Sequence, residues 1–531
     1  MMSRIIYFII CSILFSTPFH GFKLNKGQEQ LSRSNGDFPD SNGIIDIEPF
    51  SSSNSEVDYW ISTGSGLGTV RIAMESLTFH QIANKSNLPV GGNPALFSNE
   101  DITIVSGVTQ EYSIVTESYE PKGTGIGYSQ YRGTSWTYMP QPIWEEDYDN
   151  NGNHTIQWGN QELTVLAVTT DINNVSYDVG VLNNYVYTSN WAGGLRRFDY
   201  TLDSPIWEII PLPIDSEDSL FCNLVDEDNY ILDPRDPGDG GNHNHKGFSI
   251  LGTEDYLWVG TANGINRGTI HEDCINWYHQ TTASGLSGDW VVGIEQQTID
   301  EIDRIWAITW SAGEGQSNSI SYTVNDGEDW QDVEYFSNQN IKIYNLDFDG
   351  AYVYAASEKG LFYSEDLIHW EKVRRSWGDT SSGDLILDET VYSVSAPELL
   401  IGTGDGLLHY TDTNTSVYRF WNNSAASTSD NQGFTAYPNP FFISENGVFN
   451  QEGHVRFIYY NPYRLLKSEI DIYDFTMNHV INLSEKINIS DETTVIWDGR
   501  DILGNRVVNG TYFCKLSIDN KTYWTKLLVI N

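Results

Sequence analysis

The segment Tyr256-Leu-Trp-Val-Gly-Thr261, followed by Gly264-Ile265, decides the fold of this chain. It reads as a short apolar strand that ends in a small residue and a threonine, then a turn, a glycine and a second strand. The glycine permits the positive φ that a tight hairpin needs. The same pattern returns in three further segments, which are Tyr59–Thr63 before Gly66, Tyr352–Ser357 before Gly360, and Leu399–Thr403 before Gly406.

Weaker copies of the pattern end at Thr116, Ser189 and Thr309, which brings the number of copies to seven. The strand-ending Thr and Ser residues stand at 63, 116, 189, 261, 309, 357 and 403, so successive copies are 53, 73, 72, 48, 48 and 46 residues apart. A repeat of roughly 40–50 residues is typical of the four-stranded blades of a β-propeller. The sequence therefore predicts an all-β protein with a seven-bladed β-propeller over residues 57–422 and insertions within 64–260.

Three stretches give a second signal, namely Ser364–Trp370, Thr323–Trp330 and Ser129–Trp136. They resemble degenerate copies of the Asp-box (BNR) repeat of sialidase-like propellers. That repeat is a structural hairpin in which a side chain caps backbone N–H groups and a tryptophan packs between sheets. The stretch Gly285–Ile294 also resembles the repeat of two-component-regulator-type propellers. These resemblances imply a structural role for the tryptophans and carry no catalysis.

The composition changes after residue 422. Residues 423–433 are small and polar, and we expect them to form a linker. Residues 434–531 then hold an ordered series of motifs, which are Tyr437-Pro-Asn-Pro-Phe441, Val455–Tyr459, Ile470–Asp474, Trp497-Asp-Gly-Arg-Asp501, Gly504–Val508, Gly510–Phe513 and Lys526–Ile530. This order resembles the FlgD-type immunoglobulin-like domain, which is also the C-terminal sorting domain of type IX-secreted bacterial proteins. The resemblance implies an immunoglobulin-like β-sandwich and a partner in the bacterial outer-membrane secretion machinery. An adhesive or spacer sandwich is the alternative.

Residues 1–21 predict a secretory signal peptide, because Arg4 precedes an apolar run of 11 residues, Ile5–Phe15, and small residues follow. Residues 22–56 form an N-terminal segment before the propeller. No apolar run is long enough to cross a bilayer as a helix, so we expect no transmembrane segment. The chain is thus predicted to be secreted or displayed on the cell surface after passage through the periplasm.

Three cysteines remain beyond the signal peptide, at positions 222, 274 and 514. Their odd number excludes a complete disulfide framework. Cys222 and Cys274 form a disulfide if their loops meet, and are otherwise buried free thiols.

Acidic residues number 72 and basic residues 29, which gives a net charge of −43. Nucleic acid is excluded as a partner, because phosphate binding needs clustered Lys and Arg. Docking on anionic lipid is excluded for the same reason. A strongly acidic surface attracts divalent cations.

One short acidic loop has the spacing of a calcium site. In Asp147-Tyr-Asp149-Asn-Asn151-Gly152-Asn153, three oxygen-bearing side chains fall on one side of a tight turn. Oxygen ligands of this kind suit Ca²⁺. We expect Asp147, Asp149 and Asn151 to bind the cation through their side chains, and Asn153 through its backbone carbonyl. A plain polar turn is the alternative.

Two further segments are candidates for ligand contact. Arg196 and Arg197 follow a predicted hairpin, where solvated strand-end residues are the favoured interpretation. Asp236, His243 and His245 belong to a long insertion that is predicted to be a flexible acidic loop. Two histidines at this spacing, without cysteine, are a weak zinc signal. A long loop on a rigid scaffold is nonetheless a candidate for binding an extracellular protein or glycan.

The sequence therefore favours a propeller that acts as a binding or scaffold module and a C-terminal domain that serves export or attachment. An extracellular glycoside hydrolase of the sialidase-like propeller type is the alternative function. It would require arginines, a tyrosine and carboxylates that converge in the central funnel. A third interpretation, an assembly or adhesion factor of a cell-surface complex, differs only in its partner.

Overall fold

The computed structural model describes residues 43–530 with several gaps, and the predicted signal peptide, the linker, Asp147 and Asn151 lie outside the described residues. The gaps are 53–55, 74–75, 81, 83–84, 115, 144–147, 150–151, 228, 272–273, 374–376, 379–384, 387–389, 412–414, 419–433, 438, 440, 444–454, 461–466, 488–491 and 519–520. The chain divides into two compact units, Met1–Arg375 with Glu389–Tyr410, and Ser376–Asp388 with Thr411–Asn531.

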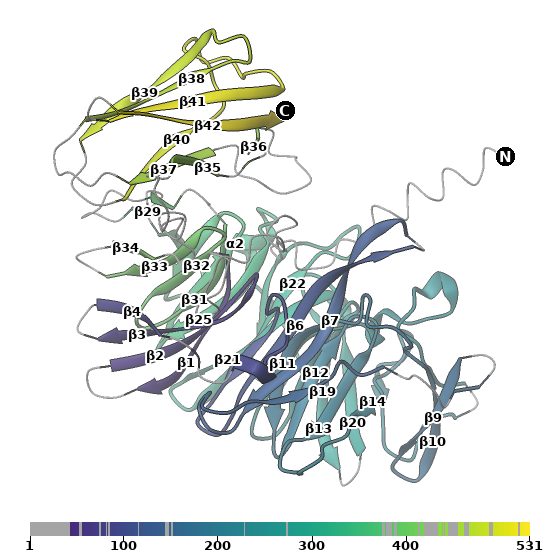
Figure 1. The fold of residues 1–531 in the computed structure, drawn as a ribbon. Helices are drawn as coiled ribbons and strands as arrows, with labels where there is room; N and C mark the ends of the chain where they lie inside the picture. Colours follow the sequence, from purple (N-terminus) through teal and green to yellow (C-terminus); the bar gives the residue numbers. More distant parts are fainter. Residues whose placement is uncertain are drawn as a thin grey trace. The chain divides into compact units, whose positions relative to one another are not determined.

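The first unit is a seven-bladed β-propeller (Figure 1). Blades 1 to 3 consist of β1 (Ile44–Ser52), β2 (Glu56–Thr63), β3 (Gly66–Ala73) and β4 (Ser76–His80); β5 (Leu96–Ser98), β6 (Thr103–Ser113), β7 (Ser118–Ser129) and β8 (Thr137–Met139); and β11 (Ser176–Leu182), β12 (Tyr185–Asn190), β13 (Gly194–Asp199) and β14 (Glu208–Ile210). Blade 4 consists of β17 (Gly247–Gly252), β18 (Leu257–Thr261), β19 (Gly264–His271) and β20 (Cys274–Gln280), with β15 (Ser219–Leu220) added at its edge.

Blades 5 to 7 complete the ring. They consist of β21 (Trp290–Ile299), β22 (Ile302–Trp310), β23 (Ser319–Thr323) and β24 (Gln331–Asp332); β25 (Ile343–Asp349), β26 (Tyr352–Ser357), β27 (Gly360–Ser364) and β28 (Glu371–Lys372); and, within the first unit, β31 (Val391–Ser395), β32 (Leu400–Thr403) and β33 (Gly406–Tyr410). Among the described residues, helical turns are α2 (Glu334–Ser337), η1 (Lys85–Asn87), η2 (Pro237–Asp239), η3 (His243–His245) and η4 (Thr282–Ser284).

The ring closes by direct packing of the last blade on the first. The first strand of each blade packs against the first strand of the next, and β31 packs against β1 in the same way. β1 begins at Ile44, so the propeller starts before residue 57 and takes in part of the segment 22–56, where the sequence predicts no blade. Two register shifts, after Ile44 and after Pro49, interrupt the alternation of β1 and hide the strand from a pattern of period two.

The repeated Thr or Ser caps the turn that follows its strand. The hydroxyl oxygens of Thr63, Thr261, Ser357 and Thr403 lie 2.6, 3.1, 2.6 and 2.9 Å from the carbonyl oxygen of the glycine three positions on. Each hydroxyl also accepts the backbone N–H two positions on. The four glycines have φ of 140°, 92°, 111° and 153°, as the sequence predicts.

The prediction that a strand ends at Thr116 is wrong. β6 ends at Ser113, and Thr116 lies in the turn beyond it. The reason is that β6 and β7 continue to pair beyond the length of other blade hairpins, down to Ser113 opposite Ser118. Tyr112 and Tyr119 face each other near the tip of this hairpin, with ring centroids 5.4 Å apart.

The three tryptophan-bearing turns have side-chain caps. Asp366 Oδ1 accepts the N–H groups of Ile368 and His369 at 2.9 and 2.7 Å. In the other two turns a strand-end hydroxyl does this, because Thr323 accepts the N–H of Gly327, and Ser129 accepts that of Gly133, both at 3.0 Å. The tryptophans that follow, Trp370, Trp330 and Trp136, are buried.

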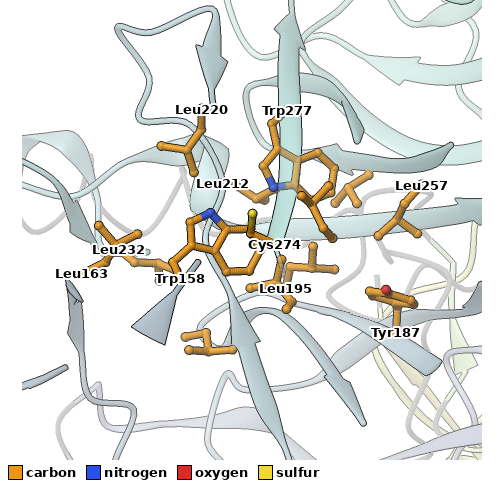
Figure 2. Close-up of a cluster of buried hydrophobic side chains, with 14 of the residues drawn as sticks. Trp158, Leu163, Tyr187, Leu195, Leu212, Leu220, Leu232, Leu257, Cys274 and Trp277 are labelled. Atoms are coloured by element: carbon orange, nitrogen blue, oxygen red, sulfur yellow. The ribbon is translucent and has the colours of Figure 1, made fainter. Parts of the chain in front are cut away.

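A small sheet is inserted between blades 2 and 4. It consists of β16 (Ile231–Leu232), β10 (Gln161–Leu166) and β9 (Asn153–Trp158). Trp158 packs with Leu195 of β13 and Trp277 of β20 in one buried cluster (Figure 2). Cys222 and Cys274 are joined by a disulfide in the same cluster, which settles the alternative that the sequence leaves open.

We refer to the extension of the β6–β7 hairpin, the small sheet and residues 211–246 as the added region. The insertions that the repeat spacing predicts within 64–260 are these segments. Hydrogen bonds tie two of them together, because Asn223 Oδ1 accepts the N–H of Asn160 at 2.7 Å and Gln161 Nε2 donates to the carbonyl of Val225 at 2.8 Å. The small sheet and residues 211–246 are therefore fixed to the ring by the disulfide and by packing in the buried cluster of Figure 2.

The second unit contains a β-sandwich of two sheets. One sheet is β35 (Phe434–Tyr437), β37 (Val455–Tyr460) and β40 (Glu492–Trp497); the other is β36 (Phe441–Phe442), β42 (Lys521–Ile530), β41 (Gly510–Ile518), β38 (Lys467–Tyr473) and β39 (His479–Ile487). Further strands of this unit are β29 (Trp377–Gly378), β30 (Leu385–Ile386) and β34 (Thr415–Tyr418). Trp497, Phe457 and Cys514, which has a free thiol, share one core between the two sheets. The sandwich therefore buries an apolar core of its own.

Candidate functional site

Five carboxylates from four blades converge on the propeller axis. Asp46 and Glu48 lie on β1, and the other three are Asp178 on β11, Glu295 on β21 and Asp347 on β25. Electrostatic interactions link them between blades 1, 3, 5 and 6, and of these only blades 5 and 6 are neighbours in the ring. Side chains of non-neighbouring blades face one another only across the axis. We call this group the axial carboxylates.

Two axial carboxylates also join neighbouring blades. Asp178 Oδ2 accepts the N–H of Ile250 in blade 4 at 2.8 Å, while its Oδ1 accepts the N–H of Val179. Asp347 Oδ2 accepts the N–H of Ala396, which follows β31 of blade 7, also at 2.8 Å. These carboxylates use hydrogen bonds in place of a covalent link to hold blade to blade.

Glu48 and Glu295 are held differently. Neither accepts a hydrogen bond from any residue in the described part of the chain. Both side chains are half-buried, and they face the other carboxylates. Their negative charges are therefore opposed by neither a cation nor a hydrogen-bond donor among the described residues.

The pKa of every axial carboxylate lies above its usual range. Burial raises the pKa of Asp46 and Asp178 to about 7 and that of Asp347 to about 6. Burial also raises the pKa of Glu48 and Glu295, and the neighbouring carboxylates raise both further. Desolvation and like charge both disfavour the ionised form. The axis thus holds carboxyl groups that change charge near neutral pH.

The axial carboxylates are not arranged as a metal centre. Within the described ranges, no three His, Cys, Asp or Glu side chains stand close enough together to hold a metal ion. Coordination needs several oxygens at about 2.0–2.6 Å from one point. What the axis offers is a negative potential, which favours cationic groups over anionic ones.

The arginines of the propeller lie elsewhere. Arg71 pairs with Asp58 at 2.6 Å, Arg267 lies over the rings of Tyr256 and Tyr278, and Arg304 donates to Gln297. These contacts are made within single blades, away from the axial carboxylates. The described residues thus bring carboxylates together on the axis but not the arginines of a sialidase-like centre.

The interpretation of Arg196 and Arg197 as solvated strand-end residues is wrong, because both side chains are buried. They lie on β13, which is covered on either side by β12 and β14. Arg196 Nε donates to the carbonyl of Gly193 at 3.0 Å, and burial lowers its pKa to about 10. Arg197 donates to Glu208 at 2.7 Å and lies over the ring of Tyr185. Their partners are therefore within the protein.

The loop that carries Asp236, His243 and His245 is built into the propeller, contrary to the prediction of a flexible loop. His245 is fully buried, where its Nδ1 accepts the N–H of Asp233 at 2.9 Å and its Nε2 lies 3.1 Å from the carbonyl of Leu212. Burial lowers the pKa of His245, so it is held neutral. Asp236 pairs with Lys246 and lies 3.6 Å from His243, so these charges are internally compensated.

The loop with the predicted calcium site is described only in part, because Asp147 and Asn151 lie outside the described residues. Asp149 Oδ1 accepts the N–H of Asn153 at 2.9 Å, and the Asp149 N–H donates to the Asn153 carbonyl at 2.8 Å. The loops Asp474–Asn478 and Asp501–Asn505 of the sandwich have the same pair of hydrogen bonds. Hydrogen bonds of the chain itself thus contribute to holding this turn. Calcium binding stays a prediction.

A cleft of about 600 Å³ opens beside blade 2, at a place where the sequence predicts no site. We call it the blade-2 cleft. It is lined by Ser86, Leu88, Pro89, Val90, Lys122, Gly123, Thr124, Tyr138, Pro140, Gln141, Pro142, Ile143, Asp171 and Trp207. The signal that marks it is the alternation of glycines in Lys122-Gly-Thr-Gly-Ile-Gly127. A β-bulge at Thr124 interrupts this alternation, because Gly107 pairs with Gly125 while Val108 pairs with Gly123, so the three glycines do not form one continuous bare face.

The fold defines the class of this protein as a β-propeller followed by a β-sandwich. No protein-family model matches the chain, and no curated protein matches it. Solved structures similar to it include PorZ, an essential bacterial surface component of the type-IX secretion system of Porphyromonas gingivalis. It is 13% identical with a TM-score of 0.36, and the match covers 92% of this chain and 66% of that one.

YCF48 from Cyanidioschyzon merolae is a second similar structure, with 11% identity, coverage of 70% and 94%, and a TM-score of 0.38. The Cps50 (Swd1) propeller domain of Myceliophteria thermophila is 11% identical with a TM-score of 0.38, and the match covers 70% of this chain and 97% of that one. The propeller fold of this chain is established by its own sheets, since all these TM-scores are below 0.5. No helix among the described residues is long and apolar enough to cross a membrane.

Proposed function

We propose that the protein is secreted or displayed on the bacterial cell surface, and that its propeller is a binding and scaffold module. The observation that carries this proposal is the added region, which is fixed to one sector of a closed ring. Blades 2 to 4 bear the extended hairpin, the small sheet and the disulfide. Loops on a rigid scaffold are where binding residues concentrate.

The test of the binding function uses the chain from residue 22 onward, immobilised on beads and on a glycan array. The expected result is capture of a defined extracellular protein or glycan. A matched variant replaces residues 112–119, the tip of the β6–β7 hairpin, by a two-residue turn. If neither protein nor glycan is retained by the wild-type chain, the binding function is wrong.

The C-terminal sandwich is proposed to direct export or surface attachment through the outer-membrane secretion machinery. The support is the ordered motif series over residues 434–531, together with the separate apolar core of the sandwich. A domain that closes its own core remains folded when its neighbour is changed. The signal peptide proposed at residues 1–21 supplies the first step, across the inner membrane.

Deletion of residues 434–531 tests this proposal. The expected result is a folded propeller that accumulates in the periplasm. The matched experiment joins residues 423–531 to a periplasmic carrier protein, which should then reach the surface or the medium. Release of the deleted chain at the normal level would leave only the spacer function for the sandwich.

An extracellular glycoside hydrolase remains the second candidate, because Glu48 and Glu295 have the raised pKa that a general acid needs. The test is hydrolysis of a panel of fluorogenic glycosides by wild type and by Glu295→Gln. We expect no turnover, since Arg71, Arg267 and Arg304 are engaged in contacts within their own blades and not at the axis. Turnover that is lost in Glu295→Gln would favour the enzyme.

A further inference from the structure

We infer that the blade-2 cleft is a binding site for a neutral oligosaccharide. This inference rests on the proposed binding function and names both the place and the ligand class. The volume of about 600 Å³ falls within the roughly 300–1,000 Å³ of small-ligand sites. The lining combines rings, prolines and a small number of polar groups, which is the usual make-up of such a site.

Gly123 and Thr124 of β7 line the cleft, and three glycines of this strand let side chains pack closely against it. A Cβ at Gly125 would lie 2.9 Å from the ring of Tyr138, and one at Gly127 would lie 2.9 Å from Pro89. A Cβ at Gly123 would lie 2.7 Å from Cδ of Gln141. The three glycines therefore let these side chains lie against the strand.

Two aromatic rings give the cleft flat apolar walls. Tyr138 is 45% exposed, and its hydroxyl donates to the carbonyl of Thr124 at 2.8 Å. Trp207 is half-buried, and its Nε1 donates to the carbonyl of Pro140 at 2.9 Å. Both rings are thus held in place by main-chain acceptors. Fixed rings of this kind suit the apolar faces of pyranose sugars, since an amphipathic ring gives contact area at little entropic cost.

Polar groups of both kinds border these rings. Lys122 Nζ lies 3.1 Å from Asp171 Oδ2 and 2.5 Å from Glu111 Oε2, so its charge is balanced. Gln141 is more than nine-tenths buried, and its Nε2 donates to Asn190 Oδ1 at 3.1 Å. Its Oε1 has no partner among the described residues, although a buried acceptor of this kind is costly to leave unpaired. A hydroxyl-rich ligand can exchange hydrogen bonds with the Lys122–Asp171 pair, whereas Gln141 Oε1 is itself buried and does not face the ligand.

Other ligand classes fit the same groups less well. A proline-rich peptide is read by Trp N–H and Tyr O–H donors in an aromatic groove, but here Trp207 and Tyr138 already donate to the main chain. An anion finds Lys122 neutralised by two carboxylates, in a chain of net charge −43. A neutral sugar meets neither difficulty.

The experiment titrates the chain from residue 22 onward with cellotriose, maltotriose, xylotriose, mannotriose and chitotriose, by calorimetry and by tryptophan fluorescence. The variants are Tyr138→Leu, which keeps bulk but removes the flat ring, and Asp171→Asn. The matched control is Tyr131→Leu, which changes a tyrosine of the same blade that is 66% exposed and lies outside the cleft lining. Thermal unfolding of all three variants checks that the propeller is intact.

The expected result is binding of at least one trisaccharide, weakened about tenfold or more in Tyr138→Leu and in Asp171→Asn and unchanged in Tyr131→Leu. The inference is overturned if no trisaccharide binds at millimolar concentration, or if Tyr138→Leu binds as wild type does. Binding of a polyproline peptide in place of sugar would overturn it as well. Capture of an extracellular protein that Tyr138→Leu retains would leave the binding function standing and the cleft inference wrong.

Discussion

Trp258 of blade 4 and Trp330 of blade 5 meet edge to face, with ring centroids 6.1 Å apart and ring planes at 88°. Trp60 of blade 1 and Trp136 of blade 2 have the same relationship at 5.6 Å and 76°. In both pairs, the second strand of one blade supplies the first ring, and the turn before the fourth strand of the next blade supplies the other. The tryptophans therefore fasten consecutive blades together.

Replacement of Trp330 by alanine should destabilise the propeller by about 3–5 kcal/mol, the usual cost of truncating a buried aromatic side chain. Trp330 is 5% exposed, and its Nε1 donates to Gln280 of the neighbouring blade. Urea unfolding monitored by fluorescence measures the change. The control is Val324→Ala in the same blade, where the side chain is 47% exposed and little change is expected. Equal stability of Trp330→Ala and wild type would show that this ring does not fasten blades.

The sequence predicts the local parts of this structure well. The strand-end hydroxyl of Thr63 or Ser357 forms hydrogen bonds with residues only two and three positions away. The repeat can therefore be recognised in a short stretch of sequence. The axial carboxylates show why the site could not be predicted. Asp46 and Glu295 are far apart in the sequence and meet only because the ring closes. The burial of Arg196 depends in the same way on the flanking strands β12 and β14. The residues of β13 alone therefore do not predict it.

Stability should rise as the pH falls from 8 to about 5. The axial carboxylates have folded-state pKa values above the unfolded values of about 4, so the folded protein binds more protons in this interval. The stability that comes from their protonation is complete below the unfolded pKa and is lost as the pH rises through about 6–7. The expected change is an increase in the melting temperature of the propeller.

Glu295→Gln and Glu48→Gln identify the groups responsible. Because neither glutamate accepts a hydrogen bond from the described residues, the neutral amide removes charge repulsion without removing a bond. Each change should stabilise the protein at pH 8 by on the order of 1 kcal/mol and flatten the pH dependence. Glu254→Gln, at an exposed position, is the control. A pH profile unchanged in both axial variants would show that other groups set it.

Loss of the disulfide should cost about 3–4 kcal/mol, because it closes a loop of 52 residues between Cys222 and Cys274. The double variant Cys222→Ser with Cys274→Ser tests this by denaturant unfolding. Thiol titration of the denatured, unreduced chain from residue 22 onward should find one thiol, that of Cys514. Three thiols per chain would contradict the pairing.

The calcium prediction is tested on loop 147–155 by melting the wild-type chain in calcium and in EGTA. Binding to the folded state raises the melting temperature by mass action. The informative variant is Asp147→Asn, since Asp149 also holds the turn through Asn153 and its loss would destabilise the loop with or without a cation. Asp147→Asn should abolish the difference between calcium and EGTA. Equal melting of the wild type in both would exclude a structural calcium site there.

Met477→Gly should stabilise the C-terminal sandwich. Met477 has a φ of 66°, and the equivalent residues of the two matching loops are Gly152 and Gly504, with φ of 82° and 83°. A side chain at such a φ is strained, and Met477 is 52% exposed, so little packing is lost with it. The gain should be about 0.5–1 kcal/mol after the larger chain entropy of glycine in the unfolded state is deducted.

Calorimetry measures this gain in the unfolding transition of the sandwich, which is identified as the transition that Trp497→Ala lowers. Gly504→Ala, the reverse change in the sister loop, should destabilise the same transition by a similar amount. If Met477→Gly lowered that transition, the turn would be stabilised by contacts of the methionine and not limited by its backbone.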